Sequence, residues 1–167
     1  ILLIMDKDIL QLAQSNQQKA WQIIKDTDII NIWQSVGARI NPVGSLKMGL
    51  MMKHRDIDFH IYTDPFSLSD SFKAMEKLAE NPAIKRIEYA NLLDTNEQCI
   101  EWHAWYQDEE ANLWQFDLIH IIAGSRYDGY FENVSDRIMA VLTDETRLAI
   151  LNIKNDTPDT EKIMGME

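Results

Sequence analysis

Two aspartates, Asp56 and Asp58, stand two residues apart in the segment RDIDFHIYT, which runs from Arg55 to Thr63. In an extended strand, side chains two residues apart point to the same face, so both carboxylates would lie side by side. Paired hard oxygen ligands of this kind suit Mg²⁺. Such an ion holds a triphosphate, neutralises developing charge and lowers the pKa of an attacking hydroxyl. Such pairs also occur in turns, so the pair indicates phosphoryl-type transfer only together with the glycine and serine that precede it.

A glycine and a serine, Gly44 and Ser45, precede this pair, and Asp56 follows Ser45 by eleven residues. Glycine permits a tight turn and a close backbone approach. A serine at a helix N-terminus can offer its hydroxyl and free amide donors to a triphosphate. Lys47 and Arg55, together with Lys53, flank the motif and can neutralise phosphates, although solvated surface charges are an equal alternative.

A third carboxylate for a two-metal site is expected on a neighbouring strand, and Asp117 in the segment Trp114–Ile122 is the best candidate. A charge within an apolar strand is costly unless it is paired or metal-bound. The alternatives are an acid paired with Arg or His, or Glu101 in its place. His60 shares the face of the two aspartates and could bind a metal or a phosphate, but a plain strand-face histidine is favoured.

The remaining histidines and aromatic residues suggest less chemistry. His103 and His120 are interpreted as strand residues without a chemical role. Five aromatic residues could stack a base, but on alternating strands they more often belong to the core: Trp102, Trp105, Tyr106, Trp114 and Phe116.

The elements that would position these residues follow from hydrophobic periodicity. Helical spacing predicts helices at Asp6–Lys25, Asp28–Val36, about Leu46–Met52, and Ser69–Glu80, the last capped by Ser69. Alternation predicts strands at Ala38–Val43, Arg55–Thr63, Ile84–Tyr89, Cys99–Tyr106 and Leu113–Ile122. The last two flank Gln107–Asn112 and suit a hairpin. Helical spacing returns over Val134–Asn155, broken near Thr143 and Asp144.

These elements predict an α/β (α+β) fold, a small mixed sheet flanked by helices. We expect residues 1–128 to form the main domain, including the N-terminal helices, and residues 129–167 a C-terminal helical segment. The tail Thr157–Glu161 carries helix-start signals, so the natural chain or helix is expected to continue past Glu167.

The stretch Pro42–Thr63 resembles the glycine-serine and aspartate-x-aspartate signature of the DNA polymerase beta-like nucleotidyltransferase superfamily. The chain is similar in layout to small bacterial-type members, over about Ala38 to Ile122. The resemblance implies transfer of a nucleoside monophosphate from a nucleoside triphosphate, with release of pyrophosphate. It assigns Mg²⁺, with two ions possible, to Asp56, Asp58 and Asp117, and the triphosphate to Gly44 and Ser45.

The chain departs from small members of the superfamily directly after the serine. They commonly carry an arginine and small residues there, whereas this chain has Lys47 and the bulky residues Met48, Leu50, Met51 and Met52. This departure bears on the triphosphate grip and on the acceptor, which we expect to be a hydroxyl of a small molecule or a protein. The alternative is a non-catalytic nucleotide-binding or regulatory module with the same fold.

Composition limits the classes of partner and the cellular location that are expected. With 16 basic and 27 acidic residues among 167, the net charge is −11, so no nucleic-acid polymer is expected as a partner. The single cysteine, Cys99, cannot form an intrachain disulfide. The apolar start Ile1–Met5 is too short to span a bilayer and lacks signal-peptide features, so no membrane partner and a cytoplasmic location are expected.

Overall fold

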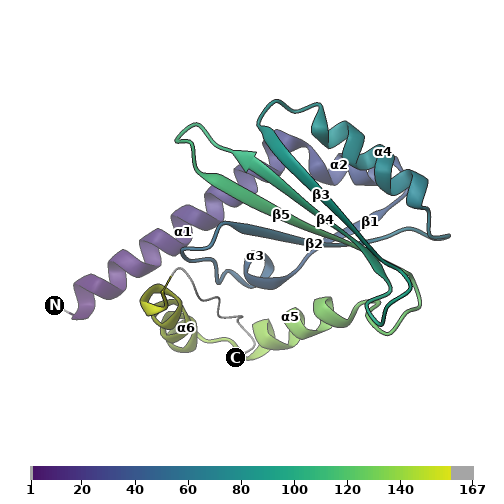
Figure 1. Cartoon of the computed structure of the whole chain (residues 1–167). Helices are drawn as coiled ribbons and strands as arrows, with labels where there is room; N and C mark the ends of the chain where they lie inside the picture. The colour runs from purple at the N-terminus through teal and green to yellow at the C-terminus, as the bar shows by residue number, and fades with distance from the viewer. Residues whose placement is uncertain (1, 159–167) are drawn as a thin grey trace.

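Five strands form one mixed sheet, in which only the two central neighbours run parallel. The computed structural model describes residues 2–158 of the chain. The strands are β1 (Arg39–Pro42), β2 (Asp56–Tyr62), β3 (Ile84–Leu92), β4 (Cys99–Gln107) and β5 (Leu113–Ile121), in the spatial order β1-β2-β5-β4-β3 (Figure 1). β2 pairs with β5 in parallel, and the other three pairings are antiparallel.

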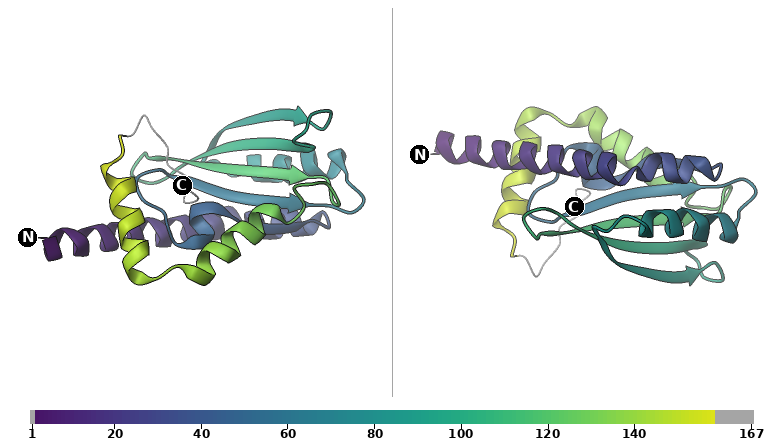
Figure 2. Two further views of the ribbon diagram at one scale, coloured as in Figure 1. Left: turned by 90° about the horizontal axis from the view of Figure 1, so that it is seen from below. Right: turned by 90° about the horizontal axis from the view of Figure 1, so that it is seen from above.

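Helices lie on both sides of this sheet. They are α1 (Leu2–Thr27), α2 (Ile29–Ser35), α3 (Gly44–Met48), α4 (Leu68–Ala79), α5 (Tyr130–Val141) and α6 (Asp144–Asp156). The C-terminal half of α1, together with α2 and α4, covers one face. In Figure 2, α3, α5 and α6 lie on the opposite side of the sheet from α4.

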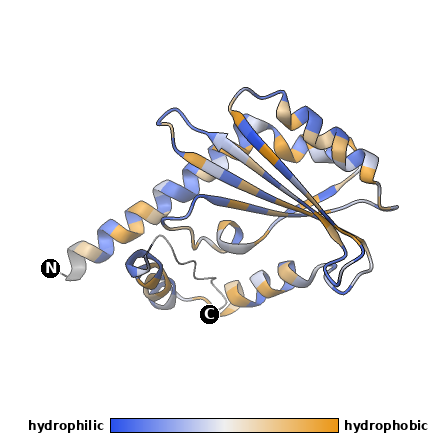
Figure 3. Cartoon of the chain, in the orientation of Figure 1, coloured by the Kyte–Doolittle hydropathy of each residue, from blue (hydrophilic) through white to orange (hydrophobic). Residues whose placement is uncertain are grey.

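The face under α1, α2 and α4 is apolar because every second residue of the central strands is hydrophobic (Figure 3). Ile57 and Phe59 of β2 and Phe116 and Leu118 of β5 are fully buried there, against Trp33 of α2. The alternate residues of the same strands point to the other face, which therefore carries the polar side chains. The predicted site residues Asp56, Asp58 and Asp117 all belong to this second face.

A second, smaller core joins the ends of the described chain. Ile9 and Ala13 of α1 pack with Met52 and with Leu151 of α6. This contact fixes α6 beside the polypeptide that leads into β2. It is the reason that a residue of α6 can reach the polar face near α3.

The fold class predicted from the sequence is confirmed, and all the predicted helices and strands within residues 2–158 are present. Three details were wrong. The cap of α4 is Ser67, whose hydroxyl accepts from the Asp70 N–H, and not Ser69. The short helix begins at Gly44 and ends at Met48, because Gly49 takes a left-handed conformation with φ 67°. α5 begins at Tyr130, directly after the left-handed Gly129.

Two further predictions concern the domain boundary and the C-terminal tail. The division after residue 128 remains a prediction, and most of the predicted tail helix lies outside the described residues. Within residues 2–158, no helix is long and apolar enough to cross a membrane.

Candidate active site

The central observation is the register of two aspartates on neighbouring parallel strands. Asp58 of β2 lies opposite Asp117 of β5, and Asp56 lies opposite Gln115. Paired residues in register point to the same face of a sheet, as do residues two apart on one strand. All three predicted carboxylates therefore share the polar face, where each is partly accessible to solvent.

Gly44 brings the start of α3 against this face. Its φ is +62°, and a Cβ added there would lie 3.1 Å from Asp58 Oδ2. The neighbouring Val43 N–H donates to the Asp58 carbonyl at 3.1 Å. Any other residue at this position would place its Cβ against the carboxylate and would have to adopt an unfavourable backbone conformation. Both effects explain why a glycine stands here.

Ser45 follows in the first turn of α3 and is hydrogen-bonded to a cation. Lys154 Nζ of α6 donates to Ser45 Oγ at 2.6 Å and to the Leu50 carbonyl at 2.9 Å. Lys154 was not among the residues predicted from the sequence, and no local signal points to it, because 109 residues separate it from Ser45. The structure thus supplies a positive charge where the resemblance assigns a triphosphate.

Asp117 is held by two side chains of the same face. His103 Nδ1 lies 2.7 Å from Asp117 Oδ1, and Gln115 Nε2 donates to the same oxygen at 2.6 Å. Glu101 is the next residue in this row, with Oε2 3.8 Å from His103 Nε2. Pairing with histidine was one alternative role for Asp117, and it is compatible with metal binding, because ligating carboxylates are commonly hydrogen-bonded in turn.

His103 was predicted to be a strand residue without a chemical role, although the sequence carries a signal for its position. If the hairpin closes between Gln107 and Leu113, counting four residues away from the turn along each strand pairs His103 with Asp117. The hairpin itself was predicted, so its register could have identified the contact.

The donor set fits Mg²⁺ in kind. Asp56, Asp58 and Asp117 offer hard oxygen ligands from two adjacent strands, as Mg²⁺ requires. Among the described residues, no three or more His, Cys, Asp or Glu side chains are already gathered tightly enough to hold a metal ion. The roles of the three aspartates as ligands therefore remain a prediction.

The predicted basic residues are placed differently from one another. Lys47 Nζ lies 2.7 Å from Asp136 of α5, and therefore links α3 to α5. Arg55 precedes β2 with an exposed side chain, and its carbonyl accepts from the Gln115 N–H at 2.8 Å. Lys53 Nζ donates to the Thr157 carbonyl at 2.6 Å. Gly44 and Ser45 thus lie with the carboxylates, whereas no described contact brings Lys47 or Arg55 to them.

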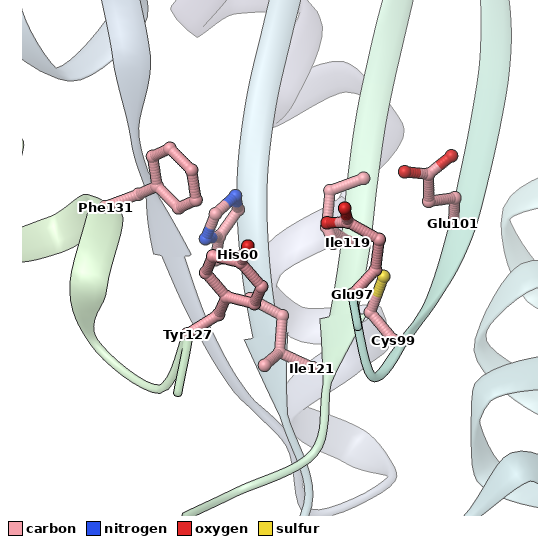
Figure 4. Close-up of a pocket in the computed structure, with 8 residues that line it drawn as sticks. All are labelled: His60, Glu97, Cys99, Glu101, Ile119, Ile121, Tyr127 and Phe131. Carbon is pink, nitrogen blue, oxygen red and sulfur yellow. The ribbon is translucent and has the colours of Figure 1, made fainter. Parts of the chain in front are cut away.

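A hollow of about 180 Å³ opens on the same polar face, beyond the aspartates (Figure 4). Its lining side chains come from β2, from β4 and the residues before it, from β5, and from the region of α5: His60, Glu97, Cys99, Glu101, Ile119, Ile121, Tyr127 and Phe131. Burial lowers the pKa of His60, and the charge of Glu132 partly offsets this. Burial raises the pKa of the Cys99 thiol to about 12.

Most of the aromatic run belongs to the core. Trp102, Trp114 and Phe116 are buried on the apolar face, and Tyr106 packs against the same cluster. Trp105 lies on the polar face with the Arg86 guanidinium 4.6 Å from its ring centroid.

Solved structures share this fold. Cid1 poly(U) polymerase with bound MgGTP matches with a TM-score of 0.60 and 15% identity, over 90% of this chain and 46% of that one. A cytoplasmic RNA terminal U-transferase matches with a TM-score of 0.56 and 13% identity, over 88% and 43%. The GLD-2/RNP-8 complex matches with a TM-score of 0.60 and 8% identity, over 92% and 54%.

The chain therefore shares the nucleotidyltransferase fold of these structures, at a distance in sequence. It spans about half the length of the structures it matches. No protein-family model matches the chain, and no curated protein matches it.

One expectation is corrected by these comparisons. The net charge of −11 led us to exclude a nucleic-acid polymer as partner. Enzymes named as a poly(U) polymerase and an RNA terminal U-transferase share the fold, so excluding RNA as a partner was wrong. The net charge was a poor guide, because it sums over the whole surface, whereas the end of a nucleic-acid strand contacts only a few residues.

Proposed function

We propose that this chain is the catalytic domain of a Mg²⁺-dependent nucleotidyltransferase, which transfers a nucleoside monophosphate from a nucleoside triphosphate to a hydroxyl group. The observation that carries the proposal is the in-register pair Asp58 and Asp117, with Gly44 directly against Asp58. The fold shared with Mg-nucleotide-bound Cid1 is consistent with it.

In the proposed reaction, the acceptor hydroxyl displaces pyrophosphate from the nucleoside triphosphate. The acceptor oxygen forms a bond to the α-phosphorus, the bond from that phosphorus to the bridging oxygen of the β-phosphate breaks, and pyrophosphate leaves. Asp56, Asp58 and Asp117 would hold Mg²⁺, which would neutralise charge on the triphosphate when bound. Asp117, fixed by His103 and Gln115, would accept the proton of the acceptor hydroxyl.

The triphosphate would lie along the start of α3. The Ser45 hydroxyl and the Lys154 ammonium are 2.6 Å apart and can contact the same phosphate group. A lysine is a compact positive charge that suits phosphate binding. Gly44 leaves room for the approach, since no side chain stands between the α3 backbone and Asp58.

The test compares Asp58→Asn with Asp94→Asn, an exposed control in the β3–β4 loop. Melting curves with each of the four nucleoside triphosphates, with and without Mg²⁺, measure binding, and pyrophosphate release measures transfer. A saturating triphosphate at about 100 times its Kd should stabilise the wild type by about 2.7 kcal/mol. Asp58→Asn should lose this effect, because the substitution removes one of the charged oxygen ligands proposed for Mg²⁺.

Acceptors should be compared in the same assay, with an RNA 3′ end beside small hydroxyl compounds. A wild type without any Mg²⁺-triphosphate shift, or an Asp58→Asn protein that behaves like Asp94→Asn, contradicts the proposal. A shift without pyrophosphate release for any acceptor favours the alternative, a non-catalytic nucleotide-binding module.

A further inference from the structure

The hollow on the polar face begins one strand repeat beyond the aspartates. His60 follows Asp58 by two residues on β2, and Ile119 follows Asp117 by two residues on β5, which corresponds to about 6.6 Å along each strand. A group bound in the hollow would therefore lie beside Asp117, about as far from it as a nucleotide base lies from its ribose hydroxyl.

The size of the hollow suits one ring system. Its volume of about 180 Å³ is smaller than the roughly 300–1,000 Å³ of pockets that enclose a whole drug-sized ligand. Ile119 and Ile121 form an apolar floor. Tyr127 and Phe131 form an aromatic wall, with rings stacked at 6.2 Å and 21°. Flat aromatic and aliphatic surfaces of this kind receive a planar ring.

The opposite wall is acidic. Figure 4 shows Glu97 and Glu101 across the hollow from Tyr127 and Phe131. No lysine or arginine lines the hollow in the part of the chain that the structure describes. A phosphate or another anion would be repelled here, whereas a ring with N–H donors on its edge would be bound by the carboxylates.

His60 completes the lining of the hollow with a largely buried ring. Its side chain is 8% exposed and lines the hollow, yet its Nδ1 has no hydrogen-bond partner within the described residues. The Phe131 ring packs edge-on against it at 5.1 Å. A buried polar atom without a partner is costly, which limits how far the His60 ring can be repacked.

We infer that this hollow binds the base of the acceptor nucleoside, with the exocyclic amino group of that base directed at Glu97 and Glu101. The inference rests on the proposed function, since it places the acceptor's ribose hydroxyl beside Asp117. The base belongs either to the end of an RNA strand or to a free nucleoside, and both present the same ring and amino group.

Binding should be measured with two nucleosides that differ only in the amino group, adenosine and purine riboside, and with short RNAs that end in each. Titrations without Mg²⁺ or triphosphate keep the result independent of the proposed function. The wild type should prefer the adenine forms about ten-fold, as expected for a hydrogen bond to a charged group. Equal binding of adenine and purine overturns the inference.

A charge-matched pair of double variants tests the acidic wall. The variant Glu97→Gln with Glu101→Gln should lower the preference to about three-fold, because hydrogen bonds to neutral groups are roughly half as strong. The control, Glu109→Gln with Glu110→Gln, changes the same charge in the exposed loop at the far end of β4 and should keep the full preference. Equal effects of both double variants overturn the inference.

A steric variant tests whether the hollow binds the base of the acceptor or the base of the donor triphosphate. Ile119→Trp fills the hollow and should abolish nucleoside and RNA binding, while the Mg²⁺-triphosphate shift of the melting temperature remains. Loss of that shift in a folded Ile119→Trp protein would assign the hollow to the donor base and overturn the acceptor role.

The same titrations distinguish an RNA end from a free nucleoside, and failure of the inference from failure of the proposed function. Tighter binding of adenosine-ended RNA than of adenosine supports an RNA end, and equal binding supports a free nucleoside. If the wild type binds adenosine as expected but shows no Mg²⁺-triphosphate shift, the proposed function fails, and the acceptor role of the hollow falls with it.

Discussion

Substitution of Gly44 by alanine tests whether the start of α3 controls the carboxylate beside it. The left-handed conformation at φ +62° costs an L-residue roughly 1–2 kcal/mol, so Gly44→Ala should lower the free energy of unfolding by about that amount. The new Cβ would also lie 3.1 Å from Asp58 Oδ2, which is tighter than ordinary van der Waals contact. The carboxylate must therefore shift by a few tenths of an ångström.

That shift should weaken Mg²⁺-triphosphate binding by about ten-fold, the low end of the effect of losing a group that orients a metal ligand. At saturating ligand, a ten-fold weaker affinity removes about 1.4 kcal/mol of ligand-induced stabilisation. Urea unfolding measures the first effect, and melting curves with Mg²⁺ and triphosphate measure the second.

Gly37→Ala is the matched control for this experiment. Gly37 has φ +81°, but a Cβ there would meet no atom within 4 Å. It should show the conformational cost alone and keep the full triphosphate shift. If both variants lose stability equally and both keep the shift, the contact between α3 and Asp58 has no role in binding, and the reasoning is refuted.

Three further predictions use other contacts. Burial between aromatic rings lowers the pKa of His120 to about 4. The stability associated with neutral His120 is therefore fully present above the unfolded pKa and is lost as the pH falls towards 4, by about 2 kcal/mol between about pH 7 and pH 5. Urea unfolding at several pH values should show this loss in the wild type and not in His120→Leu. Ser67→Ala should destabilise the protein by about 1 kcal/mol in thermal unfolding, whereas Ser69→Ala should change it by less than about 0.5 kcal/mol; the reverse order would restore the cap predicted from the sequence. Lys154→Met should weaken triphosphate binding about ten-fold by calorimetry, while Lys85→Met on the exposed part of β3 should not.

The fold was predictable where one local pattern decided it. Strict alternation in Arg55–Thr63 and Leu113–Ile122 identified β2 and β5, because one face of each strand had to be apolar. The boundaries were less predictable where a glycine conformation decided them. Gly49 could have continued a helix or ended it, and only its left-handed backbone stops α3 at Met48.

The site was predictable to the extent that its residues lie close together in the sequence or share a hairpin. Gly44, Asp56 and Asp58 belong to one short stretch, and the hairpin register could have paired His103 with Asp117. Lys154 was not predictable in this way. It reaches Ser45 across 109 residues, and that contact depends on the packing of α6 against α1 rather than on any motif.

The small core between α1 and α6 has a consequence for local unfolding. Leu151 is the only fully buried residue of α6 among those described, with Leu148 partly buried beside it. The hydrogen bond from Asn152 Nδ2 to Asp6 Oδ1 of α1 is long, at 3.5 Å. Segments with few buried contacts open before the rest of a protein does. Amide hydrogens of α6 should therefore exchange with solvent while those of β2 and β5 remain protected. Each such opening would carry Lys154 away from Ser45, so a bound triphosphate should slow exchange in α6 more than in the sheet.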